Sequence, residues 1–218
     1  GVLEALTMLA FNYPPRARLF RSELEHYLLL AREARFDATR IKGSYAGAIG
    51  IPQFLPSSYR RYAVDFDGDG RRDLTGNPAD AIGSIANYYR SHGWRAGEAI
   101  AVPAEVDPEG ATALLELGVK PQLKVGELKR RGVSPAAPVE EGPEAALIMA
   151  ESENGPSYWL GFNNFYVITR YNRSINYALV VDELARELRA RFQPENHKGG
   201  LDNNSKAIEP PLDAEGRR

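Results

Sequence analysis

Residues 43–58, GSYAGAIGIPQFLPSS, lead almost directly into residues 62–74, YAVDFDGDGRRDL, and the two stretches are the most informative part of this chain. The second stretch has acids at places 1, 3, 5 and 9 of an EF-hand-like loop and glycine at place 6, and these residues are Asp65, Asp67, Asp69, Asp73 and Gly70. A hard cation needs several oxygen ligands that converge on one point, and alternate acids around a tight glycine turn supply them. The pattern predicts a calcium loop over residues 65–77; the alternative is a solvated Asp/Gly turn.

The end of this loop departs from the EF-hand pattern. Place 12 carries a bidentate Glu in the standard loop, but Gly76 stands there and Asn77 follows it. We expect one extra residue in the loop, with Asn77 as the closing ligand and a calcium affinity lowered by the missing carboxylate charge. The sequence Asn77-Pro78-Ala79-Asp80 is also typical of a helix start, with Asn as the N-cap and Pro at the first helical position. Both roles stay open, because a calcium loop leads directly into its following helix.

Composition and charge exclude several classes of protein. The formal net charge of the 218 residues is −2 at pH 7, which gives no electrostatic case for a nucleic-acid partner. The sequence has no apolar run of about 18 residues, so it predicts no transmembrane segment. It has no cysteine, which excludes disulfides and leaves the redox compartment open.

Hydrophobic periodicity predicts a helical first part and a mixed second part. The predicted helices are residues 2–13, 14–34, a short helix from residue 56, 77–92, 125–131 and 174–192, with a turn and short helix over 41–51. The strand-like segments are residues 99–103, 145–150, 157–161 and 165–169. We therefore divide the chain into a helical core at residues 1–98, a small β-containing segment with a return helix at 99–192, and a disordered tail at 193–218. Gly1 stands inside a helical pattern with no cap before it, so we expect that an N-terminal part is absent.

Several polar and aromatic side chains are candidates for a sugar site. The Gln53 amide can donate to and accept from sugar hydroxyls or an N-acetyl group, and the Ser44 hydroxyl can orient a neighbouring carboxylate. Taken alone, each of the two is more often a turn residue. The segment FYVITRYNRSINY brings three aromatic residues that suit either a sugar site or a core, namely Tyr166, Tyr171 and Tyr177. The polar run Arg170-Tyr171-Asn172 favours a site.

The glutamates and histidines are weaker candidates. Glu151 and Glu153 lie in a stretch with the Asn/Gly/Pro signature of a turn, whereas a general acid needs a partly apolar, helix-anchored position that raises its pKa. Glu4 is a poor candidate on the first helix, and we place Glu23 and Glu25 on a solvated face among arginines. The three histidines have no metal or triad spacing, and they are His26, His92 and His197.

Four blocks, in this order, resemble the membrane-bound lytic murein transglycosylase B family: GVLEALTMLAFNYPPRARLFRSELEHYLLL, GSYAGAIGIPQFLPSSYRRYAVDFDGDG, NPADAIGSIANYYRSHGW and NFYVITRYNRS. The resemblance covers about residues 1–190. It implies a mainly helical, lysozyme-like α+β fold with a calcium EF-hand-like loop and a small β-containing part that includes YVITRYN. It also implies cleavage of the β-1,4 bond between N-acetylmuramic acid and N-acetylglucosamine of peptidoglycan, with formation of a 1,6-anhydro-muramyl end.

The resemblance also implies roles for individual residues. It places supporting residues Ser44 and Gln53 near the catalytic acid. The substrate-binding residues that it implies are Ser44, Gln53, Tyr88, Tyr166 and Tyr171, and we add Tyr45 from the turn at Ser44 and Asn172 from the polar run. The ligands that it implies for a structural calcium are Asp65, Asp67, Asp69, the backbone of Arg71 and Asn77, and the loop spacing adds Asp73. The family commonly closes this loop with Asp, so Asn77 is a departure from the family pattern.

The catalytic acid that the resemblance implies is a single Glu in a short stretch upstream of Gly1. One carboxylate suffices, because it protonates the glycosidic oxygen and then takes the proton of the muramyl 6-hydroxyl that attacks the anomeric carbon; ordinary hydrolases use two. We therefore expect this fragment itself to be inactive. The implied partner is the peptidoglycan glycan strand, and we expect a monomer in the periplasm or at the outer membrane, with a lipid anchor in the absent part. The alternative is a non-catalytic, calcium-stabilised glycan-binding module.

Overall fold

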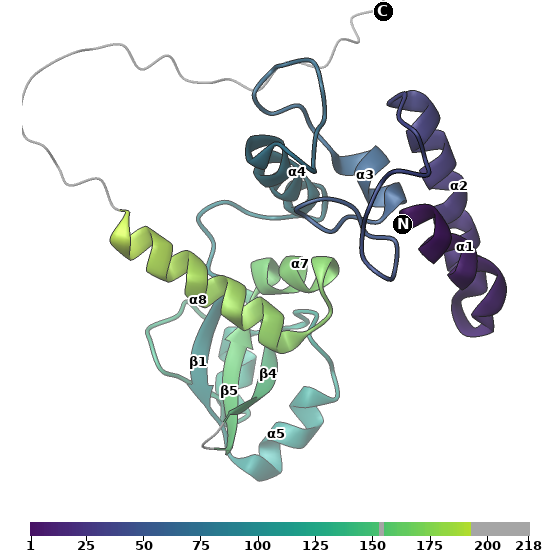
Figure 1. Cartoon of the computed structure of the whole chain (residues 1–218). Helices are drawn as coiled ribbons and strands as arrows, with labels where there is room; N and C mark the ends of the chain where they lie inside the picture. Colours follow the sequence, from purple (N-terminus) through teal and green to yellow (C-terminus); the bar gives the residue numbers. More distant parts are fainter. Residues whose placement is uncertain (153–154, 193–218) are drawn as a thin grey trace, which may run out of the picture. The chain divides into compact units, whose positions relative to one another are not determined.

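The computed structural model describes residues 1–152 and 155–192 (Figure 1). The chain divides into a unit at Gly1–Asp182 and a unit at Glu183–Arg218, and the first unit contains all the elements that build the site. The predicted tail at residues 193–218 and Glu153 lie outside the described residues. Within the described ranges, no helix is both long and apolar enough to cross a membrane.

The first part of the chain is helical, as predicted. Its elements are α1 (Val2–Asn12), the 3-10 helix η1 (Pro14–Arg16), α2 (Ala17–Glu33), α3 (Pro56–Tyr62) and α4 (Pro78–Ser91). Proline opens three of them, because its fixed φ suits a first helical position and its missing N–H is not needed there. Helices α1 and α2 lie side by side in Figure 1 and bury Leu6, Phe20 and Tyr27 between them.

The short helix predicted over residues 41–51 is wrong. This segment forms a chain of turns with two isolated antiparallel bridges, Gly43 with Ile49 and Ile49 with Phe54. Its glycines explain the difference, since Gly47 and Gly50 have φ values of +79° and +69°, which a right-handed helix does not contain.

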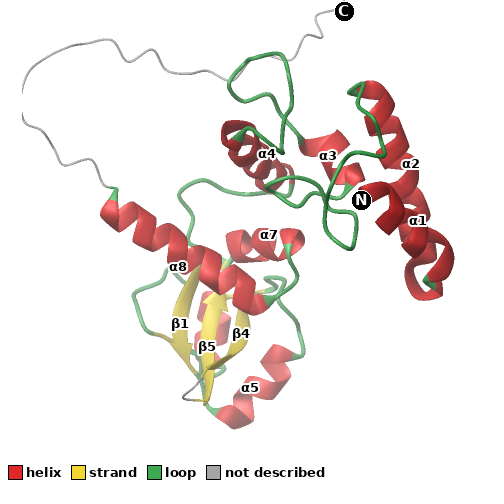
Figure 2. Cartoon of the chain, in the orientation of Figure 1, coloured by secondary structure: helices red, strands yellow, loops and turns green. Residues whose placement is uncertain are grey.

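The second part carries one antiparallel sheet, drawn in yellow in Figure 2. The strands are β1 (Ala101–Glu105), β2 (Leu123–Lys124), β3 (Ser134–Pro135), β4 (Glu144–Ser152) and β5 (Gly155–Gly161), in the order β2-β4-β5-β1-β3. The long hairpin of β4 and β5 pairs Ile148 with Trp159. Helices α5 (Pro108–Leu115), which we did not predict, and α6 (Val125–Arg130) pack residues such as Leu114 and Leu128 on Leu147 of β4.

The strand predicted over residues 165–169 is wrong, because this segment lies inside helix α7 (Asn163–Tyr171). The YVITRYN segment is therefore not part of the β-structure. Its β-branched residues favour a strand by propensity, but Phe165 and Ile168 are three residues apart and both pack into a core with Ile148 of the sheet. Helix α8 (Ile175–Arg191) follows and adds Ala178 to this core. The fold class is α+β, as predicted.

Candidate functional site

Residues 49–54, which we call the Gln53 turn, form a closed loop of main-chain hydrogen bonds. The Ile49 amide donates to the Phe54 carbonyl at 2.8 Å, and the Phe54 amide donates back at 3.1 Å. Inside this loop Gln53 has a φ of +52°, a left-handed conformation that costs a non-glycine residue energy and that clusters at functional sites. Its exposed carboxamide donates from Nε2 to the Gly50 carbonyl at 3.0 Å. The turn thus presents an amide group to solvent in a fixed place.

Ser44 organises the turn that precedes the Gln53 turn. Its Oγ accepts hydrogen bonds from the amides of Ala46 at 3.2 Å and Ala48 at 3.1 Å. Because both contacts use the oxygen as an acceptor, the hydroxyl proton remains a donor for another group. Tyr45, at the tip of this turn, is 92% exposed. Ser44 therefore combines a turn role with a hydroxyl that can orient a neighbouring acceptor.

A cluster of aromatic rings supports the Gln53 turn from α4 and α7. The ring centroid of Tyr171 lies 6.0 Å from that of Phe54, 5.4 Å from Tyr88 and 5.9 Å from Tyr89. The Tyr171 hydroxyl donates to the Pro52 carbonyl, directly beside Gln53. Tyr88 is only 9% exposed, and its hydroxyl donates to the Arg170 carbonyl at 2.7 Å.

The phenols of this cluster stay protonated through neutral pH. Burial raises the pKa of Tyr88, Tyr89 and Tyr171 above the ordinary value, and for Tyr89 the pKa reaches about 12. Tyr88 and Tyr171 are therefore dependable hydrogen-bond donors to the main chain, and they fix the backbone around the turn rather than exchange protons.

The other aromatic and amide candidates lie further along α7. Tyr166 is half-buried, and the guanidinium carbon of Arg170, one helical turn later, lies 5.8 Å from its ring centroid. Asn172 is the C-cap residue of α7 and is exposed. Its Oδ1 accepts from the Ser174 amide at 3.1 Å. The structure thus joins Tyr171 to the Gln53 turn, whereas Tyr166 and Asn172 stay predictions as sugar contacts.

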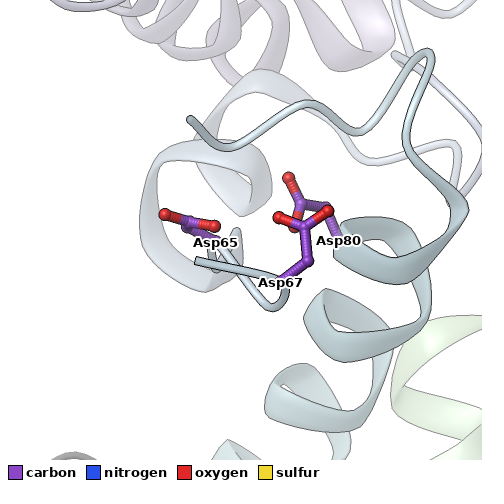
Figure 3. A group of neighbouring side chains, drawn as sticks. All are labelled: Asp65, Asp67 and Asp80. Carbon is purple, nitrogen blue, oxygen red and sulfur yellow. The ribbon is translucent and has the colours of Figure 1, made fainter. Parts of the chain in front are cut away.

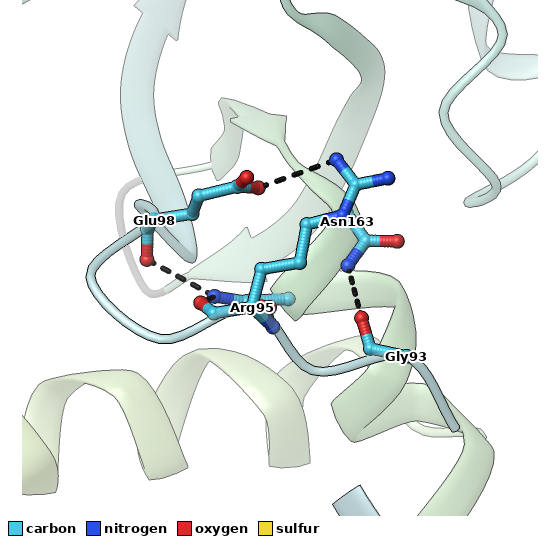
Figure 4. A network of polar contacts seen from close by, with 5 residues as sticks. Gly93, Arg95, Glu98 and Asn163 are labelled. Atoms are coloured by element: carbon cyan, nitrogen blue, oxygen red, sulfur yellow. Dashed lines mark hydrogen bonds and ion pairs between the residues drawn. The ribbon is translucent and has the colours of Figure 1, made fainter. Parts of the chain in front are cut away.

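Two asparagines that we did not predict hold the start of α7, and Figure 4 shows one of them, Asn163, with its hydrogen bond to Gly93. Asn164 is fully buried; its Oδ1 accepts from the Arg95 amide at 2.9 Å, and its Nδ2 donates to the carbonyls of Arg95 at 2.7 Å and Glu98 at 3.1 Å. Asn163 donates to the Gly93 carbonyl at 2.8 Å. The loop after α4 is therefore tied to α7, which carries Tyr171.

The acidic loop at residues 65–77 and the first turn of α4 bring three carboxylates together (Figure 3). Asp65, Asp67 and Asp80 each offer an oxygen, and these oxygens lie within 4.8 Å of one another. We call these three residues the cation cluster. Asp80 was not predicted as a ligand. Its position in the first turn of α4 was the available signal, since a loop ligand can come from the helix that follows.

The side chain of Asp80 also shapes the acidic loop, because it binds main-chain amides of that loop. It is fully buried, and its two carboxylate oxygens accept from the amides of Phe66 and Asp73, both at 2.8 Å. Asp65 accepts from the amides of Gly68 and Gly70, both at 2.8 Å. A carboxylate retains further lone pairs when it accepts such bonds, so these groups still suit a hard cation.

The remaining acids predicted as ligands, Asp69 and Asp73, are not members of the cation cluster. Asp69 accepts from the Arg71 amide at 2.8 Å, and Asp73 accepts from the amides of Thr75 at 2.8 Å and Gly76 at 2.9 Å. These bonds are those of local turns, and Arg71 is exposed. Asp69, Asp73 and the Arg71 backbone stay predictions as ligands.

Asn77 is the N-cap of α4, which confirms the predicted helix start. Its Oδ1 accepts from the amides of Ala79 at 3.0 Å and Asp80 at 3.4 Å. Its Nδ2 donates to Asp67 at 2.7 Å, and this hydrogen bond lowers the pKa of the Asp67 carboxyl. The ligand role of Asn77 stays a prediction.

The prediction of a solvated Glu23 is wrong. Glu23 is only 4% exposed, and its carboxylate accepts from the Ser57 amide at 2.9 Å and the Ser57 hydroxyl at 2.6 Å. The first amides of a helix need acceptors, and Leu55 at the N-cap of α3 has no side chain that can serve, so α2 supplies one. Glu4 and Glu151 are exposed, on α1 and β4.

Comparisons with known proteins agree on one family. The family model described as the transglycosylase SLT domain matches residues 1–186. The membrane-bound lytic murein transglycosylase B of Escherichia coli K12 is 45% identical over 185 residues, which are 85% of this chain and 50% of that protein. The chain thus spans half the length of this curated relative.

Solved structures are similar over the same region. The lytic transglycosylase SLT35 of Escherichia coli, in complex with calcium, is 44% identical, with a TM-score of 0.77 over 88% of this chain and 60% of that chain. SltB3 of Pseudomonas aeruginosa, in complex with NAG-NAM-pentapeptide, is 35% identical, with a TM-score of 0.73 over 86% of this chain and 50% of that chain.

Proposed function

Because the chain belongs to the transglycosylase SLT domain family, we propose that the protein is a lytic transglycosylase of peptidoglycan. It cleaves the β-1,4 bond between N-acetylmuramic acid and N-acetylglucosamine and leaves a 1,6-anhydro-muramyl end. The observation that carries this proposal is the family match over residues 1–186, which includes the Gln53 turn and α7. The SltB3 complex with NAG-NAM-pentapeptide supports the substrate class.

We propose that this chain contributes substrate positioning to the reaction. The Gln53 carboxamide can accept from a sugar hydroxyl and donate to an N-acetyl oxygen. The left-handed backbone conformation of Gln53 fixes the direction in which this side chain leaves the turn. The Ser44 hydroxyl, whose oxygen is already used by two amides, donates to the carboxylate that performs the acid–base steps. In this proposal Tyr171, whose hydroxyl donates to the Pro52 carbonyl beside Gln53, and Tyr88 support the sugar site, and Tyr45, Tyr166 and Asn172 are further candidate sugar contacts.

The acid–base group itself, in this proposal, is a Glu that precedes Gly1 in the whole protein. Three glutamates of the described residues do not suit this role. Glu23 is buried and accepts two hydrogen bonds from Ser57, and Glu4 and Glu151 are exposed. An exposed carboxyl lacks the apolar surroundings that keep a general acid protonated near neutral pH. General acid–base catalysis contributes roughly 10²- to 10⁴-fold to the rate, so replacing this Glu in the whole protein leaves at most a trace of turnover.

We further propose that the cation cluster binds calcium as a structural ion. Asp65, Asp67 and Asp80 would hold it, with Asp69, Asp73, the Arg71 backbone and Asn77 as further oxygen donors. Oxygen-only ligands suit a hard cation, and the calcium complex of SLT35 supports calcium in particular.

We also propose that the protein works at the outer membrane or in the periplasm. The Escherichia coli relative is named as membrane-bound, which supports this location.

Digestion of peptidoglycan sacculi with the whole protein tests the proposed function. We expect 1,6-anhydro-muropeptides by mass spectrometry, whereas products hydrated at the new end would overturn the proposal. Gln53→Ala lowers kcat/KM by roughly tenfold or more, because it removes an amide held at the sugar. The matched control is Gln122→Ala, another exposed glutamine whose Nε2 donates to a main-chain carbonyl, that of Leu117 at 2.8 Å. The control retains full activity.

A further inference from the structure

The acidic loop and the Gln53 turn touch through their main chains. The residue that follows Asp73 is Leu74, which is fully buried, and its carbonyl accepts a hydrogen bond from the Ile51 amide at 2.8 Å. Ile51 lies two residues before Gln53. The end of the acidic loop is therefore a direct support for the turn that presents the Gln53 carboxamide.

Gly50 makes this close approach possible. A Cβ atom at residue 50 would lie 2.3 Å from the Leu74 carbonyl oxygen and 2.8 Å from the Leu74 carbonyl carbon, distances that real Cβ atoms do not show. The obstacle is main chain and not the flexible end of a side chain, so it cannot move aside easily. Gly50 also has a φ of +69°. Both facts require glycine where the turn meets the loop.

The position of Leu74 is in turn set from α4 and α3. Asp80 fixes the amide of Asp73, the residue before Leu74, at 2.8 Å. The Tyr59 hydroxyl donates to the Arg72 carbonyl at 2.5 Å and accepts from the Leu74 amide at 3.4 Å. Asp80 is at the same time a member of the cation cluster. One carboxylate thus faces the proposed cation and holds the segment on which the Gln53 turn rests.

We propose that Gly50 and Leu74 are positioning residues that couple the Gln53 turn to occupancy of the cation cluster. Three carboxylates in close reach repel one another, and a cation between them removes this repulsion and fixes Asp80. The ordered Asp80 then fixes the segment from Asp73 to Leu74 and, through the Ile51 amide, the Gln53 turn. Because linkage is reciprocal, a sugar on Gln53 strengthens cation binding by the same factor as the cation strengthens sugar binding.

Amide hydrogen exchange of the 218-residue chain tests the coupling without any sugar. We expect calcium to slow exchange of the Ile51 amide by about fivefold or more, the lower end of usual couplings between sites. For Gly50→Ala, we expect calorimetry to show that calcium still binds, while the exchange rate of the Ile51 amide no longer depends on calcium. The matched control is Gly97→Ala, since Gly97 has a φ of +81° but no atom within 4 Å of an added Cβ. It carries the same backbone strain and keeps the calcium effect.

A sugar probe provides the second measurement. We use the β-1,4-linked tetramer of N-acetylglucosamine and expect calcium to lower its Kd by about fivefold in the wild type and in Gly97→Ala, but not in Gly50→Ala. This part rests on the proposed function. Protection of Ile51 by calcium without any tetramer binding would contradict the proposed sugar site and leave the coupling intact. The coupling also rests on the proposed calcium site, which calorimetry of the wild type tests by itself. Calcium that binds to the wild type by calorimetry but leaves Ile51 exchange unchanged would overturn the coupling, whether or not Gly50→Ala folds.

Discussion

Replacing Asn164 with alanine removes three hydrogen bonds at a fully buried position. The change leaves the Arg95 amide and the carbonyls of Arg95 and Glu98 without their side-chain partner. Each buried polar group that loses its partner costs about 1–3 kcal/mol. At the lower end for each of the three groups, Asn164→Ala lowers the free energy of unfolding by about 3 kcal/mol. For a chain of this size, that loss corresponds to a Tm lower by about 6–12 °C.

Urea and thermal unfolding of the 218-residue chain, followed by circular dichroism, measure this loss. The matched control is Asn163→Ala, the neighbouring residue with one hydrogen bond, to Gly93, and partial exposure; we expect a loss of about 1 kcal/mol or less. Asn164→Asp keeps an acceptor for the Arg95 amide but turns a carboxylate oxygen toward two carbonyls, so it is no less harmful than alanine. Substitutions of surface residues usually change the free energy of unfolding by no more than about 0.5 kcal/mol. A free energy of unfolding for Asn164→Ala that lies within this range of the wild-type value would refute the reasoning.

Three further predictions concern Glu23, calcium and pH. Glu23→Ala lowers the free energy of unfolding by about 1–2 kcal/mol because Ser57 loses its acceptor, while exposed Glu25→Ala changes it little; equal losses in urea unfolding would contradict this. Calcium at a hundredfold excess over its Kd stabilises the chain by roughly 3 kcal/mol, and Asp80→Asn reduces that gain; a Tm that chelator leaves unchanged would exclude a structural cation. Burial raises the pKa of Tyr89 to about 12 in the folded chain, whereas the pKa in the unfolded chain is near 10. The contribution of protonated Tyr89 to the free energy of unfolding is therefore fully present below about pH 10 and is lost as the pH rises toward 12. Unfolding between pH 9 and 12 shows a shallower decline in Tyr89→Phe than in the wild type, and identical declines would refute this role.

The sequence predicts most helices because their signals are local. Proline at the first position, Asn77 at the N-cap and Gly93 after α4 act within a few residues, and the structure has each of them in that role. Helix α7 could not be predicted in this way. Its VIT run favours a strand, and what makes it helical is the core around Phe165 and Ile168, which only tertiary packing supplies.

The candidate site could be predicted only in part, because only some of its residues belong to local sequence patterns. Gln53, Asp65 and Asp67 lie in motifs whose spacing is visible along the chain, whereas Asp80 and Glu23 are acids that meet their partners across a turn or between helices. Acids in a sequence are usually solvated, so nothing local marks these two as buried. Asp80 is buried because it satisfies the amides of Phe66 and Asp73, and Glu23 is buried because α3 begins with an uncapped amide.

The acceptors that shape the candidate site are mostly main-chain carbonyls. Pro52 accepts from Tyr171, Arg170 accepts from Tyr88, and Leu74 accepts from Ile51. A carbonyl is present at every residue, so the sequence cannot mark which ones are used. The consequence is that ring and hydroxyl of one tyrosine act separately: Tyr171→Phe keeps the ring against Phe54 and Tyr88 but releases the Pro52 carbonyl beside Gln53. Such a variant frees the Gln53 turn from α7 while the aromatic packing stays, and its stability loss is limited to the one unpaired carbonyl, about 1–3 kcal/mol.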